Sequence, residues 1–217
     1  MKIICISDTH NQHEQLKLPD GDVLVHAGDF SMRGHVAETQ SFLDWFAAQP
    51  HPHKIFIAGN HDFIFEKRRK KARAMVPDSV IYLEDQEITL EGVKFWGSPI
   101  TPTFFDWAFN RGPWVIVRHW DLIPEDTDVL ITHGPPLGTL DRVLPEGEHV
   151  GCPKLKEALD LRLRPKLHVF GHIHEGYGQV VEGGRISVNA SFLDHGYRPA
   201  NPPVVVELTA TKQGQLN

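Results

Sequence analysis

The sequence is poor in cysteine and lacks long apolar runs. Its two cysteines, Cys5 and Cys152, are too few for a disulfide framework and fit a reducing compartment. No segment approaches the roughly 20 apolar residues that a membrane span requires. The apolar part of MKIICISDTH is too short for the hydrophobic region of a signal peptide, and no cleavage site follows it. We therefore expect a cytoplasmic protein with no membrane partner.

Positive charge is also scarce. The 217 residues include 22 Lys and Arg against 28 Asp and Glu, so the formal charge is −6, which argues against general binding to nucleic acid. The run EKRRKKAR at 66–73 could be a nucleic-acid patch, but the acidic balance favours the solvent-exposed face of a helix. No stretch resembles a linker or a repeat, so we expect a single domain over residues 1–217.

The residue in excess is histidine, with 14 copies. Apolar runs rich in β-branched residues recur along the chain, and each stops at a Gly, Asp or His. Continuous rather than alternating apolar runs are typical of strands buried on both faces. We predict such strands at 2–7, 22–27, 54–58, 128–132 and 166–170.

Helical patterns and hairpins lie between and after these strands. Helices are predicted at 35–49, 65–75 and 153–163, the last with Pro153 in its first turn. Residues 80–98, 178–190 and 202–208 are predicted to be strands, the first two as hairpins. Alternating β and α units followed by hairpins indicate an α/β fold of two mixed sheets packed together, with helices outside.

Each predicted buried strand is followed by polar side chains suited to metal binding. The strand ends bear Asp-x-His, Gly-Asp, Gly-Asn-His-Asp, a single His and Gly-His-x-His. Strand carboxyl ends are where α/β sheets usually place their sites, and residues i and i+2 of an extended segment face the same way. The candidate metal ligands are Asp8, His10, Asp29, Asn60, His133, His172 and His174.

This set is too large for one ion, which normally takes about three or four protein ligands, and suits two ions that share one ligand. A carboxylate is a natural bridge because its two oxygens can bind two cations, and Asp29 is our candidate. Glycine beside the ligands permits tight turns and close approach of the backbone. Carboxylate, amide and imidazole ligands without thiolate suit two divalent ions of Mn, Fe, Zn, Ni or Co.

The order of these motifs resembles that of the calcineurin-like metallophosphoesterases, D-x-H, G-D, G-N-H-[DE], H and G-H-x-H. The segments GSPITPTFFDWAFN, THGPPLG, RPKLHVFGHIHEGYG, VNAS and NPPVVVEL extend the resemblance to a group of metallophosphoesterase-domain-containing proteins of vertebrates and bacteria. Some members of that group lack the first histidine of the last motif. This chain retains it as His172, so the resemblance implies two competent metal sites.

The resemblance implies a four-layer α/β/β/α sandwich and an assignment for each ligand. Asp8, His10, Asp29 and His174 would hold the first ion, and Asp29, Asn60, His133 and His172 the second. His61 would then be the general acid or a phosphate contact, with Asp62 orienting it.

The expected activity is hydrolysis of phosphodiesters by in-line attack of a hydroxide shared between the two ions, with His61 assisting the leaving group. Cyclic nucleotides (2′,3′- or 3′,5′-cyclic) and aryl phosphodiesters are the substrates that the resemblance implies. Two alternatives stay open. One is a phosphomonoesterase or promiscuous phosphoesterase on the same site, which would call for additional basic contacts. The other is a non-catalytic nucleotide-binding relative.

The aromatic segment 99–120 has two interpretations. It is either a core-packing excursion or a rim over the metals, where Phe104, Phe105 or Trp107 could stack a nucleobase. His149 and Asn189 are further candidate pocket residues. His26 and His168 lie inside apolar runs and are expected to be hydrogen-bonded core histidines.

Overall fold

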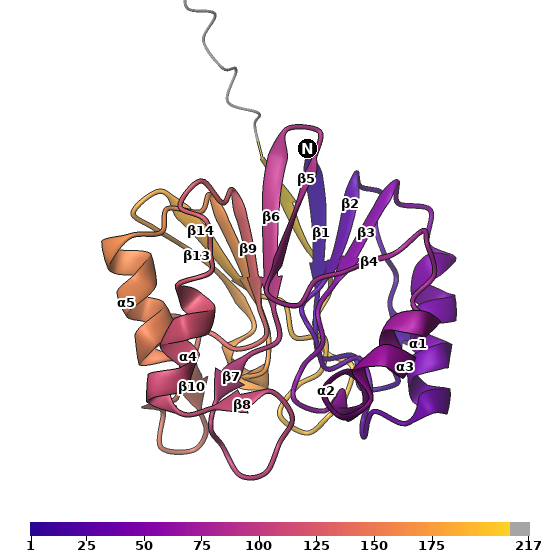
Figure 1. The fold of residues 1–217 in the computed structure, drawn as a ribbon, viewed down its shortest axis with the longest axis horizontal. Coiled ribbons are helices and arrows are strands. Elements are labelled where there is room, and N and C mark those ends of the chain that lie inside the picture. Colours follow the sequence, from indigo (N-terminus) through magenta and orange to yellow (C-terminus); the bar gives the residue numbers. More distant parts are fainter. Residues whose placement is uncertain (209–217) are drawn as a thin grey trace, which may run out of the picture.

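Two β-sheets lie face to face at the centre of the molecule, and helices cover the outer face of each (Figure 1). This arrangement is that of a computed structural model, which describes residues 1–208. The α/β/β/α sandwich of two mixed sheets predicted from the sequence is confirmed.

The first sheet has the strand order β15-β1-β2-β3-β4, with β1 to β4 parallel and β15 antiparallel to β1. Its strands are β1 (Lys2–Ile6), β2 (Val23–His26), β3 (His53–Phe56), β4 (Ile81–Tyr82) and β15 (Val204–Glu207). The predicted strands at 2–7, 22–27 and 54–58 thus form its centre.

The second sheet has the order β13-β14-β12-β9-β6-β5, parallel from β6 to β14 and antiparallel at both edges. Its strands are β5 (Gln86–Leu90), β6 (Val93–Ser98), β9 (Val129–Thr132), β12 (Leu167–Phe170), β13 (Gly178–Glu182) and β14 (Arg185–Asn189). The strands predicted within 80–98 divide between the sheets, because β4 belongs to the first and the hairpin of β5 and β6 forms one edge of the second. The hairpin predicted at 178–190 forms the other edge.

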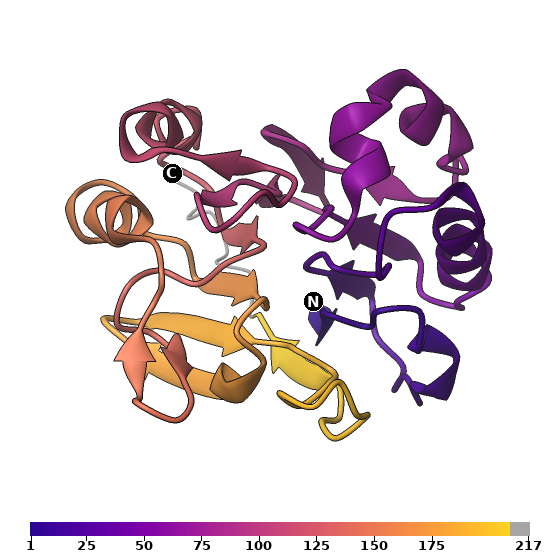
Figure 2. The ribbon, with the colours of Figure 1, turned by 90° about the horizontal axis from the view of Figure 1, so that it is seen from below.

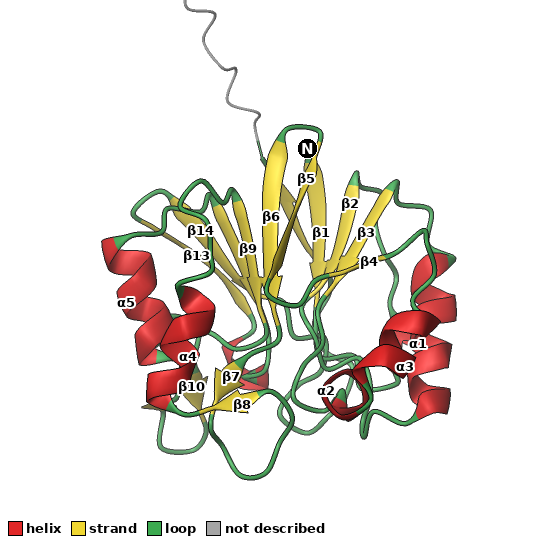
Figure 3. Cartoon of the chain, in the orientation of Figure 1, coloured by secondary structure: helices red, strands yellow, loops and turns green. Residues whose placement is uncertain are grey.

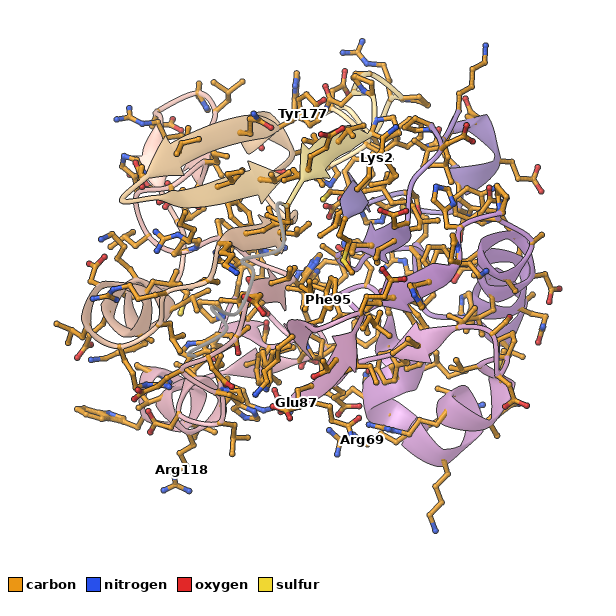
Figure 4. The ribbon with its side chains drawn as sticks, turned by 90° about the horizontal axis from the view of Figure 1, so that it is seen from above. Lys2, Arg69, Glu87, Phe95, Arg118 and Tyr177 are labelled. Carbon is orange, nitrogen blue, oxygen red and sulfur yellow. The ribbon has the colours of Figure 1, made fainter. Side chains whose placement is uncertain are left out.

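Alternation along β1 explains why its apolar run is continuous. Ile3 and Cys5 face the second sheet and belong to the core between the sheets, whereas Ile4 and Ile6 face the helices. Figure 4, viewed from above, shows Phe95 of β6 between the two sheets, where it belongs to the same inner core.

The helices divide between the two outer faces (Figure 3). On the first sheet lie α1 (Val36–Ala47), α2 (Phe63–Lys67) and α3 (Arg69–Met75), and on the second α4 (Pro113–Trp120) and α5 (Pro153–Leu161). Among the described residues, no helix has the length and apolarity needed to cross a bilayer.

The helix predicted at 65–75 is instead two helices separated at Arg68, which has non-helical φ −135° and ψ 45°. The pieces have different anchors. Helix α2 buries Ile64 and Phe65 in the core, whereas α3 pairs Arg69 and Arg73 with the buried carboxylate of Glu84. The break at Arg68 lets α2 keep its core contacts while α3 keeps its ion pairs with Glu84.

The segment 99–120 contains a helix that the sequence analysis missed. It forms the short strands β7 (Thr101–Pro102) and β8 (Asn110–Arg111), followed by α4. Helix α4 buries Ile116 and Trp120, but Trp114 is 85% exposed, so apolar residues on both faces hide the helical period. Proline at its first position was the available signal.

Candidate metal centre

The predicted ligands lie on loops that leave the carboxyl ends of β1, β2, β3, β9 and β12. These loops meet at one end of the two sheets, at the bottom of Figure 1 and toward the viewer in Figure 2. An isolated parallel bridge between Ser7 and Ser191 joins the first sheet to the second at this end. The site therefore lies on the seam between the two sheets.

The backbone of this region is strained. Asp8, His10, Asp29 and His172 all have positive φ, between 39° and 69°. Residues other than glycine rarely adopt such values. Such conformations cost on the order of 1–3 kcal/mol each and persist where the surrounding structure imposes them, often at functional sites. Four predicted ligands in this conformation point to a region shaped by chemistry rather than by stability.

One group of possible metal-ligating atoms comes from Asp8, His10 and His174, all within 4.8 Å of one another. The His174 Nε2 atom lies 3.6 Å from Asp8 Oδ1. The His10 Nε2 atom is buried and has no hydrogen-bond partner among residues 1–208, which is costly unless another group, such as a metal ion, engages it. Asp29 Oδ2 is 3.8 Å from this nitrogen.

A second group comes from Asp29, His133 and His172, again within 4.8 Å. His133 Nε2 lies 3.3 Å from Asp29 Oδ2 and 2.9 Å from Asn60 Oδ1. Asp29 Oδ2 thus neighbours His10 of the first group and His133 of the second. This is the position required of a bridging carboxylate.

The site histidines are oriented by backbone carbonyls. The Nδ1 atom of His10 donates to Ser31 O, that of His133 to Ala27 O and that of His174 to Asp194 O, over 2.9 to 3.1 Å. A carbonyl can only accept, so Nδ1 bears a proton in each ring and Nε2 is the atom that faces the site. Metal-binding histidines characteristically have this arrangement. In the metal-free site His133 Nε2 donates to Asn60 Oδ1, so its proton must leave before a cation binds there.

Asp8 is held in a similar way. Its carboxylate accepts hydrogen bonds from the backbone N–H of His172 at 2.9 Å and from the Ser191 hydroxyl at 2.9 Å. Gly171 and Gly59 lie so close to Asp8 and Asp29, respectively, that a Cβ at either glycine would overlap the carboxylate. The predicted close approach of the backbone is therefore present at both acids.

Charge pairing shapes the pKa values of the metal-free site. Burial alone would raise the pKa of Asp29, but His133 and His61 hold it well below its usual range. Burial alone would lower the pKa of His133 and His174, but Asp29 raises the first to about 9 and Asp8 raises the second to about 9. Cations that bind here would displace protons from these rings.

His61 forms a third group of possible metal-ligating atoms with His10 and Asp29, although the sequence prediction assigns it to neither ion. Its Nε2 atom lies 3.9 Å from Asp29 Oδ2, and its Nδ1 donates to Met32 O at 2.9 Å. The indole of Trp107 stacks on the imidazole, with centroids 4.3 Å apart. His61 therefore presents one nitrogen to the site from a ring fixed on two sides.

Asp62 does not orient His61 as expected. Its buried carboxyl accepts the backbone N–H groups of Asp29, Gly59 and Ser31 and the Ser31 hydroxyl, over 2.6 to 3.0 Å. Burial and the Asp29 charge raise its pKa to about 8, against the effect of these hydrogen bonds. Asp62 thus ties the loop after β2 to the loop after β3, and the Met32 carbonyl orients His61 instead.

A cavity of about 480 Å³ opens over the cluster, and Asp29, Asn60, His61, His172 and His174 line part of it. Of the predicted substrate contacts, Phe104 and Trp107 line the cavity. Phe105 is 81% exposed and does not. The aromatic segment therefore fits both interpretations in part, because Ala108 and Phe109 of the same segment are buried in the core.

Asn189 and His149 do not line the cavity either. Asn189 is fully buried, its amide donates to Ile173 O at 2.7 Å and to Leu140 O, and its Oδ1 accepts the backbone N–H of Ser191. His149 lies on β11 (Glu148–His149), where its Nδ1 is paired with the buried Asp141. Both residues support loops beside the cavity.

Several residues of the site escaped the sequence analysis. Ser191 follows strand β14, so the strand-end pattern could have found it. Tyr197 has φ 59° and its ring lies 5.0 Å from that of His10 and 5.1 Å from that of His174. No local pattern marks Tyr197, because the loop between β14 and β15 is placed by the tertiary structure.

Residues 1–176 match the family model described as calcineurin-like phosphoesterase. The chain belongs to this family. It is 41% identical to the human Metallophosphoesterase domain-containing protein 1, over 95% of this chain and 71% of that protein. A UPF0046 protein of Caenorhabditis elegans is 36% identical over 94% of this chain and 74% of its own length. A solved structure of an Aquifex aeolicus protein of unknown function aligns with TM-score 0.42 and 18% identity, over 94% of this chain and 95% of that one.

Proposed function

We propose that this metallophosphoesterase uses two divalent cations to hydrolyse phosphodiesters, among them cyclic nucleotides and aryl diesters. One observation carries the proposal: Asp29 Oδ2 lies 3.8 Å from His10 Nε2 and 3.3 Å from His133 Nε2, between two groups of possible ligand atoms in a buried cluster under an open cavity. The two free, buried cysteines fit the reducing cytoplasm as its compartment.

In this proposal Asp8, His10 and His174 bind the first cation, and Asn60, His133 and His172 bind the second. Asp29 binds both. When bound, the cations neutralise phosphate charge and acidify a shared water. The nitrogen and oxygen donors suit Mn, Fe, Zn, Ni or Co.

His61 supplies the proton for the leaving group. Its Nδ1–H is held by Met32 O, so the proton that it transfers is the one on Nε2, which faces Asp29 and the cavity. General acid assistance of this kind contributes about 10²- to 10⁴-fold. The Trp107 ring restricts rotation of the imidazole.

The cavity favours diesters over monoesters. Among the described residues that line it there is no Lys or Arg, whereas a monoester carries an additional charge that basic side chains would have to meet. Its walls include Phe104, Trp107 and Tyr197, which offer aromatic faces to an organic ester group.

The test combines elemental analysis with a phosphoester panel. Protein stripped of metal and reloaded with each of the five metals should bind about two equivalents. It should hydrolyse bis(p-nitrophenyl) phosphate or a cyclic nucleotide faster than p-nitrophenyl phosphate. A single equivalent of metal, or binding of AMP without turnover by any metal form, would contradict the proposal.

A further inference from the structure

The cavity wall carries one carboxylate that neither metal group uses. Glu175 follows His174 in the short 3₁₀ turn η2 (His174–Gly176) and is exposed on the cavity lining. Its carboxylate accepts a hydrogen bond from the backbone N–H of Leu144, at a long 3.4 Å. Within residues 1–208 it makes no ion pair, and Arg142 of the neighbouring hairpin lies instead against Gly147. Glu175 therefore lines the cavity with a carboxylate that no cationic side chain of residues 1–208 neutralises.

Aromatic rings surround the same space. Tyr197 flanks His174 and lines the cavity, 43% exposed, and Phe104 and Trp107 line it as well. Glu175 and Tyr197 both line this cavity, and the ring of His174, the chain neighbour of Glu175, lies 5.1 Å from that of Tyr197. A carboxylate beside aromatic faces attracts an organic cation and repels an anion.

The position of Glu175 means that its charge acts on the second ester group of a substrate rather than on the phosphoryl group. The reacting phosphoryl group must lie at the metal cluster, and Glu175 belongs to none of the three groups of possible ligand atoms found among residues 1–208. The cations cannot be neutralising Glu175 as ligands, so its field acts on the ester group that extends along the cavity. Among residues 1–208, the cavity lining includes no Lys or Arg that would offset this charge.

We propose that Glu175 and Tyr197 form a subsite for an organic cation, so that the enzyme prefers phosphodiesters whose second ester group carries an amine or quaternary ammonium. This inference rests on the proposed phosphodiesterase function and names its substrate class. It makes Glu175 the residue that sets charge preference.

Three esters with the same leaving group test the subsite. p-Nitrophenyl phosphorylcholine, bis(p-nitrophenyl) phosphate and p-nitrophenyl phosphate all release p-nitrophenolate, while the other substituent is cationic, neutral or an ionised oxygen. Two ratios are measured. The first is the kcat/KM of p-nitrophenyl phosphorylcholine divided by that of bis(p-nitrophenyl) phosphate. The second is the kcat/KM of p-nitrophenyl phosphate divided by the same value. Glu175→Gln should lower the first ratio about three- to tenfold and raise the second by a similar factor.

The matched control is Glu182→Gln, which removes the same charge from an exposed residue of β13 outside the cavity lining. Both of its ratios should stay within about twofold of those of the unaltered protein. The effect of Glu175→Gln should shrink between low and high salt, because mobile ions screen exposed charges. Ratios for Glu175→Gln that match the control would overturn the subsite while leaving the phosphodiesterase proposal intact.

A binding experiment separates the two proposals if no ester is hydrolysed, an outcome that would reject the proposed function alone. Calorimetry compares phosphocholine with its neutral carbon isostere, 3,3-dimethylbutyl phosphate, on the metal-loaded protein. The unaltered protein should bind phosphocholine about three- to tenfold more tightly than the isostere. Glu175→Gln should bind the two equally. Equal binding by the unaltered protein would overturn the cation subsite.

Discussion

Histidines inside the strands and histidines at the strand ends behave in opposite ways. His168, within β12, has its proton on Nε2, because Thr132 Oγ donates to Gly134 O and so must accept from the ring. His26 likewise accepts the Gly28 N–H at Nδ1. The strand-end rings of His10, His133 and His174 instead donate from Nδ1 to carbonyls and turn Nε2 to the site. In these five histidines, the role of Nδ1 differs with the position in the strand.

The charge state differs in the same way. Burial lowers the pKa of His26 to about 3 and holds that of His168 well below its usual value. The neighbouring carboxylates raise the pKa of His133 and His174 to about 9 against the effect of their burial. One residue type thus serves as a neutral core side chain in one place and as a paired, metal-competent group a few residues away.

Removing a strand-end histidine should have the largest effect. In His172→Ala, diester hydrolysis should fall below detection and metal content should drop from about two equivalents to about one, because the second group loses a ligand. Elemental analysis and the bis(p-nitrophenyl) phosphate assay measure both. Full activity with two bound ions would rule out the assignment.

His61→Ala should keep both metals and lose rate, by about 10²- to 10⁴-fold with poor leaving groups and by less with p-nitrophenolate. A series of diesters with leaving groups of rising pKa provides the measurement. His149→Ala, which removes a ring outside the cavity lining, is the control. Equal losses across the series would count against the acid role of His61.

Ser191→Ala should weaken metal binding through Asp8, whose Oδ2 accepts the serine hydroxyl. Loss of such a supporting partner typically costs about 10- to 100-fold in metal affinity or activity. Ser98→Ala is matched, because Ser98 is also fully buried and donates to a carboxylate, that of Asp85. Both variants should lose stability, but metal titration should detect a change in affinity only for Ser191→Ala.

The smallest effect should appear in the pH dependence of stability. Because the folded state keeps His26 and His168 neutral, the unfolded chain binds more protons below about pH 6.5, and the free energy of unfolding falls as pH falls. The limit is about 1.4 kcal/mol per pH unit for each ring. His168→Gln should make this decline shallower in urea titrations between pH 6.5 and 4.5. An unchanged slope would contradict a neutral His168.

Much of the fold was predictable because both faces of each sheet are covered, so the strands are continuous apolar runs that end at polar residues. Helix α4 was not predictable in this way, since Trp114 is apolar and exposed on a helix of eight residues. The break at Arg68 depends on Glu84, which lies on the chain after β4 and reaches α3 only in the folded protein.

The part of the candidate site that could be predicted consists of residues directly after strands, namely the seven ligands from Asp8 to His174. Residues that reach the site from longer loops were not predictable. Tyr197 is brought there by the loop before β15, and Glu175 had no feature other than its neighbours in the motif. Asn189 was expected in the pocket because it ends a strand, yet its amide is occupied by the carbonyls of two loops.

The position of the site on the seam between the sheets has a mechanical consequence. In the proposed assignment each cation takes ligands from both halves: Asp8, His10, Asp29 and Asn60 follow strands of the first sheet, and His133, His172 and His174 follow strands of the second. Bound ions would therefore connect the loops of the first sheet to those of the second. By mass action, the melting temperature should rise with the concentration of free metal. A chelator should first weaken the contact between the two sheets at the end that carries the site.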